Sequence, residues 1–88
     1  MREVILTPAQ VRGARALLGL HQEQLATSAS VVRKTVADFE RSKAETHPRT
    51  SAAISKALED AGIVFIPPGD GVGPGERLRR EDDTDSMP

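Results

Sequence analysis

The chain has no cysteine and only two aromatic residues, Phe39 and Phe65, among its 88 residues. Without cysteine it forms no disulfide and no thiolate zinc site, which fits a reducing, cytoplasmic compartment. Two aromatic side chains are too few for the stacking platform that binds single-stranded nucleic acid. No apolar run approaches the roughly 20 residues of a membrane span, and residues 1–6 lack the apolar stretch of a secretion signal. The chain is long enough for one small domain.

The sequence also lacks the residue sets that build common catalytic and metal sites. Its two histidines, His21 and His47, are too few to hold a metal ion in the absence of cysteine. No Ser/His/Asp or Cys/His constellation is present. The glycine-rich run 69–75 lies beside prolines and between two short expected strands, so it is not typical of a phosphate-binding loop. We therefore expect no enzymatic activity, no metal and no cofactor.

The net charge of −1 hides an uneven distribution of charged residues. Four acids and no base lie in residues 81–88, so the rest of the chain carries twelve basic against nine acidic residues, a net charge of +3. A modestly basic body with an acidic tail is compatible with nucleic-acid binding but does not require it.

Capping signals and apolar spacing predict four helices. The first begins after Thr7, which with Pro8 and Gln10 forms a capping-box pattern, and it ends at Gly19. The others are expected at about 22–29, 32–41 and 50–61, and the short connection between the second and third indicates that they cross steeply. The apolar positions expected to pack inward are Val11, Ala14, Leu17, Leu18, Leu25, Ala26, Ala29, Val36, Phe39, Ala53, Ile54, Ala57, Leu58 and Ala61.

The residues after the fourth helix change to a β-rich pattern. Residues 63–66 favour a strand that ends at Pro67 and Pro68, and the alternation in 76–79 predicts a return strand. Residues 3–6 are compatible with a further short strand. We divide the chain into a mainly helical domain (1–68), a glycine-rich loop with the return strand (69–80) and a disordered acidic tail (81–88).

Three short segments in the middle of the chain occur in an order and at spacings that form a motif. QEQLA (22–26) is followed by ASV (29–31) and TVADFER (35–41). Together they resemble the Cro/repressor-type helix-turn-helix of the xenobiotic-response-element (XRE) family of transcriptional regulators. RALLGL (15–20) and AGIVFIP (61–67) are similar to the flanking parts of that family, so the likeness covers about residues 7–68.

The resemblance implies a fold and a function. The fold is a mainly α, four- to five-helix, lambda-repressor-like DNA-binding domain, and the short segments GPG (73–75) and RLR (77–79) look like a subgroup with a C-terminal β-hairpin. The implied function is sequence-specific binding of double-stranded operator DNA in order to repress or autoregulate transcription.

The third helix is the candidate reader of the DNA. A major groove admits one α-helix, so a reader projects that helix outward while its neighbours clamp it. With Val36 and Phe39 facing inward, four side chains fall on the outer face or its flanks, and the resemblance implies the same four as base readers. They are Arg33, Lys34, Ala37 and Asp38. Arginine or lysine can donate to guanine, and aspartate can accept from a cytosine amine. The alternative for Asp38 is an ion pair with Lys34 one helical turn earlier.

Residues around this helix are candidates for phosphate contacts, which position a protein without reading sequence. The resemblance implies that Gln22 anchors a phosphate at the start of the second helix, where backbone N–H groups suit an anion; a solvated glutamine is the alternative. The further candidates are Thr35, Lys43, Thr46 and Arg49. By resemblance, Arg15 and Glu40 form a structural ion pair between the first and third helices.

The sequence departs from the family pattern at the entry to the third helix. Ser30 stands where the turn usually holds glycine, and Val32 stands where a serine or threonine cap is common. His21 and Ser42 are similar departures. They leave open that the outer surface serves another partner.

We expect a homodimer on a partly palindromic operator. An exposed strand edge is a natural pairing surface, and the candidate dimer residues are Val64, Phe65, Ile66 and Leu78. Contacts through the fourth helix are the alternative. The competing function is a protein-binding module, such as an antitoxin or an antiactivator with a toxin or regulator as its partner. The near-neutral charge, the missing caps and the acidic tail motivate it.

Overall fold

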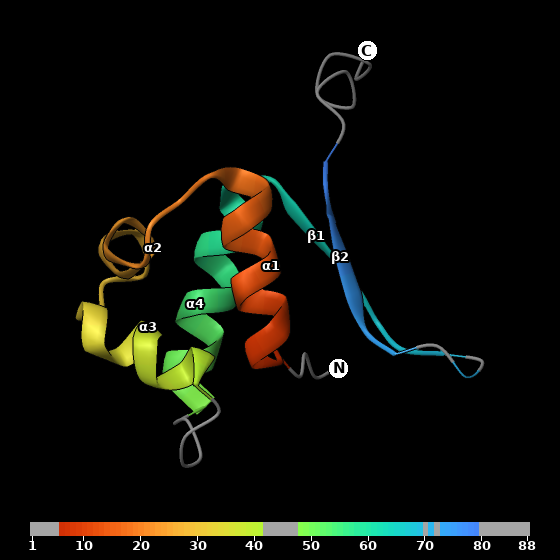
Figure 1. Ribbon diagram of the computed structural model, residues 1–88, viewed down its shortest axis with the longest axis horizontal. Coiled ribbons are helices and arrows are strands. Elements are labelled where there is room, and N and C mark those ends of the chain that lie inside the picture. The colour runs from red at the N-terminus through yellow and green to blue at the C-terminus, as the bar shows by residue number, and fades with distance from the viewer. Residues whose placement is uncertain (1–5, 42–47, 70, 72, 80–88) are drawn as a thin grey trace.

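The computed structural model describes residues 6–41, 48–69, 71 and 73–79. This part of the chain is mainly helical and ends in a two-stranded antiparallel hairpin (Figure 1). The elements are α1 (Pro8–Leu18), α2 (Gln22–Ala29), α3 (Arg33–Glu40), α4 (Pro48–Asp60), β1 (Ile63–Ile66) and β2 (Gly75–Leu78). The prediction of a mainly helical chain with a short C-terminal strand pair is confirmed. The possible strand at 3–6 and the tail 81–88 lie almost wholly outside the described residues.

The first helix begins and ends where its capping signals predict. The Thr7 hydroxyl accepts from the Gln10 backbone N–H at 3.1 Å, and the Gln10 side chain accepts from the Thr7 N–H at 3.0 Å. Gly19 follows the helix in the left-handed conformation, with φ 70°. These contacts satisfy backbone groups that a helix end would otherwise leave unpaired.

The junction between α2 and α3 is tight and carries the two off-pattern residues. Ser30 adopts a left-handed conformation, φ 60° and ψ 40°, that glycine adopts with less strain. Val32 is extended at the N-cap of α3 and its side chain accepts no hydrogen bond there. Consequently α3 begins at Arg33 rather than at residue 32. The fourth helix begins two residues earlier and ends one residue earlier than predicted.

The core lies between the four helices and β1. Its largest fully buried members are Val11, Leu25, Val36, Ile54, Leu58 and Ile63. Two predicted core positions are wrong. Leu17 is 45% exposed, and Ala61 is exposed because α4 ends before it and the chain turns at Gly62, φ 113°, into β1.

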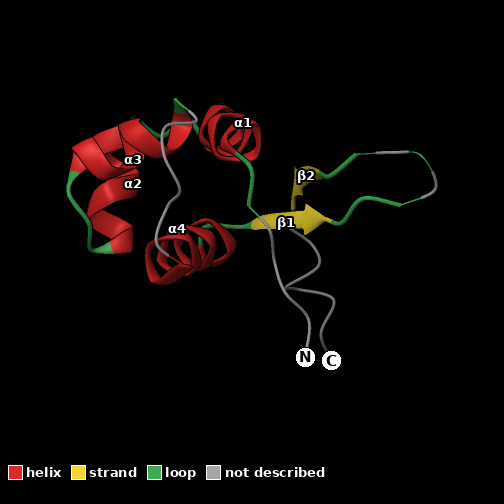
Figure 2. Ribbon diagram, turned by 90° about the horizontal axis from the view of Figure 1, so that it is seen from below, coloured by secondary structure: helices red, strands yellow, loops and turns green. Residues whose placement is uncertain are grey.

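The hairpin lies on the far side of α1 and α4 from α2 and α3 (Figures 1 and 2). Its strands pair in antiparallel register, with Ile63 opposite Leu78 and Ile66 opposite Gly75. The return strand covers Gly75–Leu78, one residue earlier than predicted. β2 contacts α1 and β1 contacts α4, and the Gln10 amide donates to the Gly75 carbonyl at 3.0 Å. The hairpin is therefore anchored to α1 and α4. It does not cover α3, which lies on the opposite side of these two helices.

The uncapped start of α3 leads to a stability prediction. We expect Val32→Ser to raise the free energy of unfolding by about 1 kcal/mol, because serine can accept from the unpaired N–H groups of the first turn. For a domain of this size that gain corresponds to about 4–8 °C in melting temperature. The control is Val32→Ala, which removes the same exposed apolar surface but supplies no acceptor. Equal melting temperatures for the serine and alanine variants would show that capping does not limit this helix.

Candidate nucleic-acid interface

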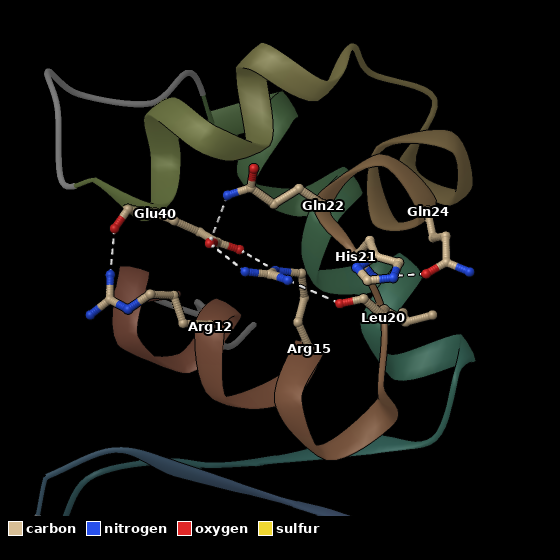
Figure 3. Close-up of polar contacts among 7 residues, drawn as sticks. All are labelled: Arg12, Arg15, Leu20, His21, Gln22, Gln24 and Glu40. Atoms are coloured by element: carbon tan, nitrogen blue, oxygen red, sulfur yellow. Dashed lines mark hydrogen bonds and ion pairs between the residues drawn. The ribbon is translucent and has the colours of Figure 1, made fainter.

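The carboxylate of Glu40 joins the first three helices (Figure 3). Glu40 is the last residue of α3 and is only 5% exposed. From α1, Arg15 donates to both of its oxygens, with Nε to Oε2 at 2.6 Å and Nη2 to Oε1 at 2.9 Å. From α2, the Gln22 amide donates to Oε1 at 3.0 Å. One buried acid therefore sets the position of α3 relative to both neighbouring helices.

Two further contacts of the α1 arginines strengthen this cluster. Arg15 donates through Nη1 to the Leu20 carbonyl at 2.9 Å, in the loop between α1 and α2. Arg12 donates to the backbone carbonyl of Glu40. The Arg12 contact was not predicted, although Arg12 lies one helical turn before Arg15 on the same side of α1 and that spacing could have indicated it.

The cluster shifts the pKa of both members of the ion pair. Burial alone raises the pKa of Glu40, but the hydrogen bonds from Arg15 and Gln22 outweigh burial, and its pKa is lower than usual. The hydrogen bond to Glu40 raises the pKa of Arg15. Both residues are therefore charged at neutral pH, and the buried carboxylate is neutralised by a bidentate partner, the geometry that a buried charge requires.

The two sides of α3 differ in burial and in charge. Val36 and Phe39 are buried on the inner side, whereas Arg33 and Lys34 are exposed. Ala37 and Asp38 are partly buried on the flank of the exposed side. Within the described part of the chain, the side chain of Arg33 makes no hydrogen bond or ion pair with another residue. The arrangement leaves a guanidinium available at the N-terminal end of the helix.

Asp38 has two basic partners, Lys34 on the same helix and Arg41 at its C-cap. Its Oδ2 accepts from Lys34 Nζ at 2.9 Å, and its Oδ1 accepts from Arg41 Nη2 at 2.6 Å. The Lys34 pair is the alternative that the sequence left open. The Arg41 pair was missed, although the i,i+3 spacing of Asp38 and Arg41 is visible in the sequence. The hydrogen bond from Lys34 and then that from Arg41 lower the pKa of Asp38.

The candidate phosphate contacts are only partly described. Gln22 is partly buried and donates one of its two side-chain N–H groups to Glu40, so a phosphate there would meet the other side-chain N–H and the backbone N–H groups at the start of α2. Thr35 is partly buried on α3, and Arg49 is exposed in the first turn of α4. Lys43 and Thr46 lie outside the described residues.

The four candidate dimer residues are not equivalent. Ile66 and Leu78 are 42% and 44% exposed. Val64 is partly buried, and Phe65 packs against the hydrophobic core. Phe65 shares the core-facing side of β1 with Ile63 and is less exposed than Ile66, and the assignment of all four residues to a dimer contact stays a prediction.

Comparisons with protein-family models and with curated protein sequences find no match to the chain. Within the described ranges, no helix combines the length and hydropathy needed to cross a membrane. The same ranges contain no group of three or more histidine, aspartate or glutamate side chains placed to hold a metal ion.

The Glu40 cluster predicts a pH-dependent loss of stability in Glu40→Gln. This variant leaves Arg15 without its counter-charge, which we expect to lower the free energy of unfolding by about 3 kcal/mol at neutral pH. Because the pKa of Glu40 is lowered by folding, its contribution is present above the ordinary value of 4.5 and is lost as the pH falls through the folded-state pKa. The difference between wild type and variant should therefore shrink in acid.

Urea unfolding at a series of pH values measures this difference. The control is Glu59→Gln on the exposed side of α4, which should unfold like wild type at every pH. A difference between wild type and Glu40→Gln that stays constant across the acidic range would contradict the charge-based account.

Proposed function

We propose that the chain is a sequence-specific regulator that binds double-stranded DNA and belongs to the XRE type of helix-turn-helix proteins. In this proposal the fold is lambda-repressor-like, α2 and α3 form the helix-turn-helix, and α3 enters the major groove. The observation that carries it is the asymmetry of α3. Its inner side is held by Val36, Phe39 and the Glu40 cluster, while Arg33 and Lys34 project from its outer side.

A helix with this arrangement meets the physical requirements of a base reader. The residues near its N-terminus are those that contact base edges when such a helix docks in the groove. Arg33 has no competing partner among the described residues and can donate two hydrogen bonds to guanine O6 and N7. Lys34 adds a second donor, and the Ala37 methyl group can contact a thymine methyl. Both oxygens of Asp38 already accept hydrogen bonds, from Lys34 and Arg41.

The remaining candidate residues are proposed to hold the protein in place on the DNA and do not read its sequence. The backbone N–H groups at the start of α2 around Gln22, the Thr35 hydroxyl and the Arg49 guanidinium are proposed phosphate contacts. Lys43 and Thr46 are proposed on their sequence position alone. A homodimer that pairs the exposed strand edges of the hairpin leaves α3 free because the hairpin lies on the far side of α1 and α4 (Figure 2). The exposed Ile66 and Leu78 lie on opposite faces of the hairpin and flank such an edge.

The test is selection of duplexes from a random pool, followed by affinity measurements with variants. We expect Arg33→Ala to relax the preference at one or two base pairs per half-site by about 1–3 kcal/mol, because a bidentate contact to one base is lost. Lys43→Ala should instead weaken binding to all duplexes alike, and Lys56→Ala, on the exposed side of α4, should change neither property. An Arg33→Ala protein that selects the same sequences as wild type would remove Arg33 from the reading surface.

Salt dependence separates this function from the competing one. Binding through several phosphates weakens steeply as salt rises, so retention of duplexes at low salt and their release at high salt support the regulator. If no duplex binds at low salt, the proposal fails and a protein-binding module remains. The observation that favours that module is Val32, an apolar side chain that is 67% exposed at the entry to α3.

A further inference from the structure

The exposed side of α3 carries a row of three charges with the acid in the middle. Lys34 precedes Asp38 by four residues and Arg41 follows it by three, so all three side chains lie along one face of the helix. Each oxygen of Asp38 holds one cation, at 2.9 Å and 2.6 Å. The two basic side chains are 78% and 65% exposed. In the free protein, therefore, the two cations nearest Asp38 are already engaged by a carboxylate.

A second exposed ion pair in the same molecule, on α4, provides a comparison for the number of basic partners that Asp38 has. On α4, Lys56 donates to Asp60 at 3.2 Å with the same i,i+4 spacing. Asp60 has this one partner among the described residues, whereas Asp38 has two and lies on the side of α3 proposed to face DNA. The hydrogen bonds from Lys34 and then Arg41 lower the pKa of Asp38, so its carboxylate is charged at neutral pH.

A phosphate that approaches this face meets the Asp38 carboxylate as a competitor. Non-specific binding depends almost entirely on phosphate contacts, so it needs Lys34 and Arg41 free to turn toward the backbone. A specific complex has a different requirement. Lysine has three donor hydrogens, so Lys34 can keep one hydrogen bond to Asp38 and direct another at a base edge. The carboxylate therefore opposes non-specific contacts more than specific ones.

We propose that Asp38 is a specificity-determining residue that acts without reading a base: it holds Lys34 and Arg41 against non-specific phosphate contacts and positions Lys34 for the groove. The inference rests on the proposed DNA-binding function and replaces the expectation that Asp38 accepts from cytosine. It makes Asp38 a positioning residue whose effect is seen in the ratio of specific to non-specific affinity.

The experiment compares full-length wild type, Asp38→Asn and Asp60→Asn on a selected duplex and on a random duplex of equal length, by fluorescence anisotropy across salt concentrations. Each phosphate contact made available contributes about 0.9 to the salt slope and therefore about tenfold in affinity near 0.1 M salt. Because Asp38→Asn releases both Lys34 and Arg41, we expect it to bind the random duplex about tenfold to a hundredfold more tightly, for one or two added contacts, with a salt slope steeper by about 0.9 to 1.8. Its affinity for the selected duplex should rise by much less, and Asp60→Asn should match wild type throughout.

A conservative variant separates charge from shape. Asp38→Glu keeps the carboxylate within reach of both cations and should restore weak binding to the random duplex. Thermal melting of each variant verifies that the exposed substitutions leave the fold intact.

The possible failures are distinct. If Asp38→Asn loses preference at a single base pair while binding random DNA like wild type, Asp38 is a base reader and the inference is overturned. Unchanged affinities for both duplexes overturn it as well, with the DNA-binding function intact. If wild type retains neither duplex at low salt, the proposed function fails and the inference fails with it.

Discussion

The buried carboxylate of Glu40 is the contact on which the position of α3 depends. It is the last residue of α3, and it accepts hydrogen bonds from Arg15 of α1 and Gln22 of α2. If one of the three helices moved independently, the buried carboxylate would lose a hydrogen-bond partner. Hydrophobic packing through Val36 and Phe39 supplies area but little directionality. The directional restraint comes from the bidentate pair, because its geometry is satisfied in only one orientation of the helices.

Because apolar packing and the Glu40 ion pair both act on the inner side of α3, the helix stays fixed while its outer side presents charged residues. The inner side is held by apolar burial and by the Glu40 cluster, and the outer side makes only local contacts, above all the pairs of Asp38 with Lys34 and Arg41. Exposed pairs of this kind add little to stability. Their effect is on where the cations point, so the same side chains can be rearranged by a ligand without disturbing the core.

Much of the local structure could be predicted because its signals are local. The Thr7–Gln10 capping box, Gly19 and the spacing of Leu25, Ala26 and Ala29 each act within one or two helical turns, and the first two helices begin and end where these signals indicate. The errors arose at positions decided by distant neighbours. Leu17 has apolar spacing but no described element covers it, and Ala61 is exposed because the chain turns at Gly62 into β1.

By itself, the sequence determined the helical content, the caps, the inner and outer faces of α3 and the change to β structure after α4, because periodicity and capping depend on residues a few positions apart. Only the tertiary structure decided that Gln22 donates to Glu40, that Gln10 holds the hairpin through the Gly75 carbonyl, and that the hairpin packs on α1 and α4. The first two contacts join residues 18 and 65 positions apart. The third depends on apolar surfaces that come together only after the helices have packed, and no local sequence pattern predicts contacts over such separations.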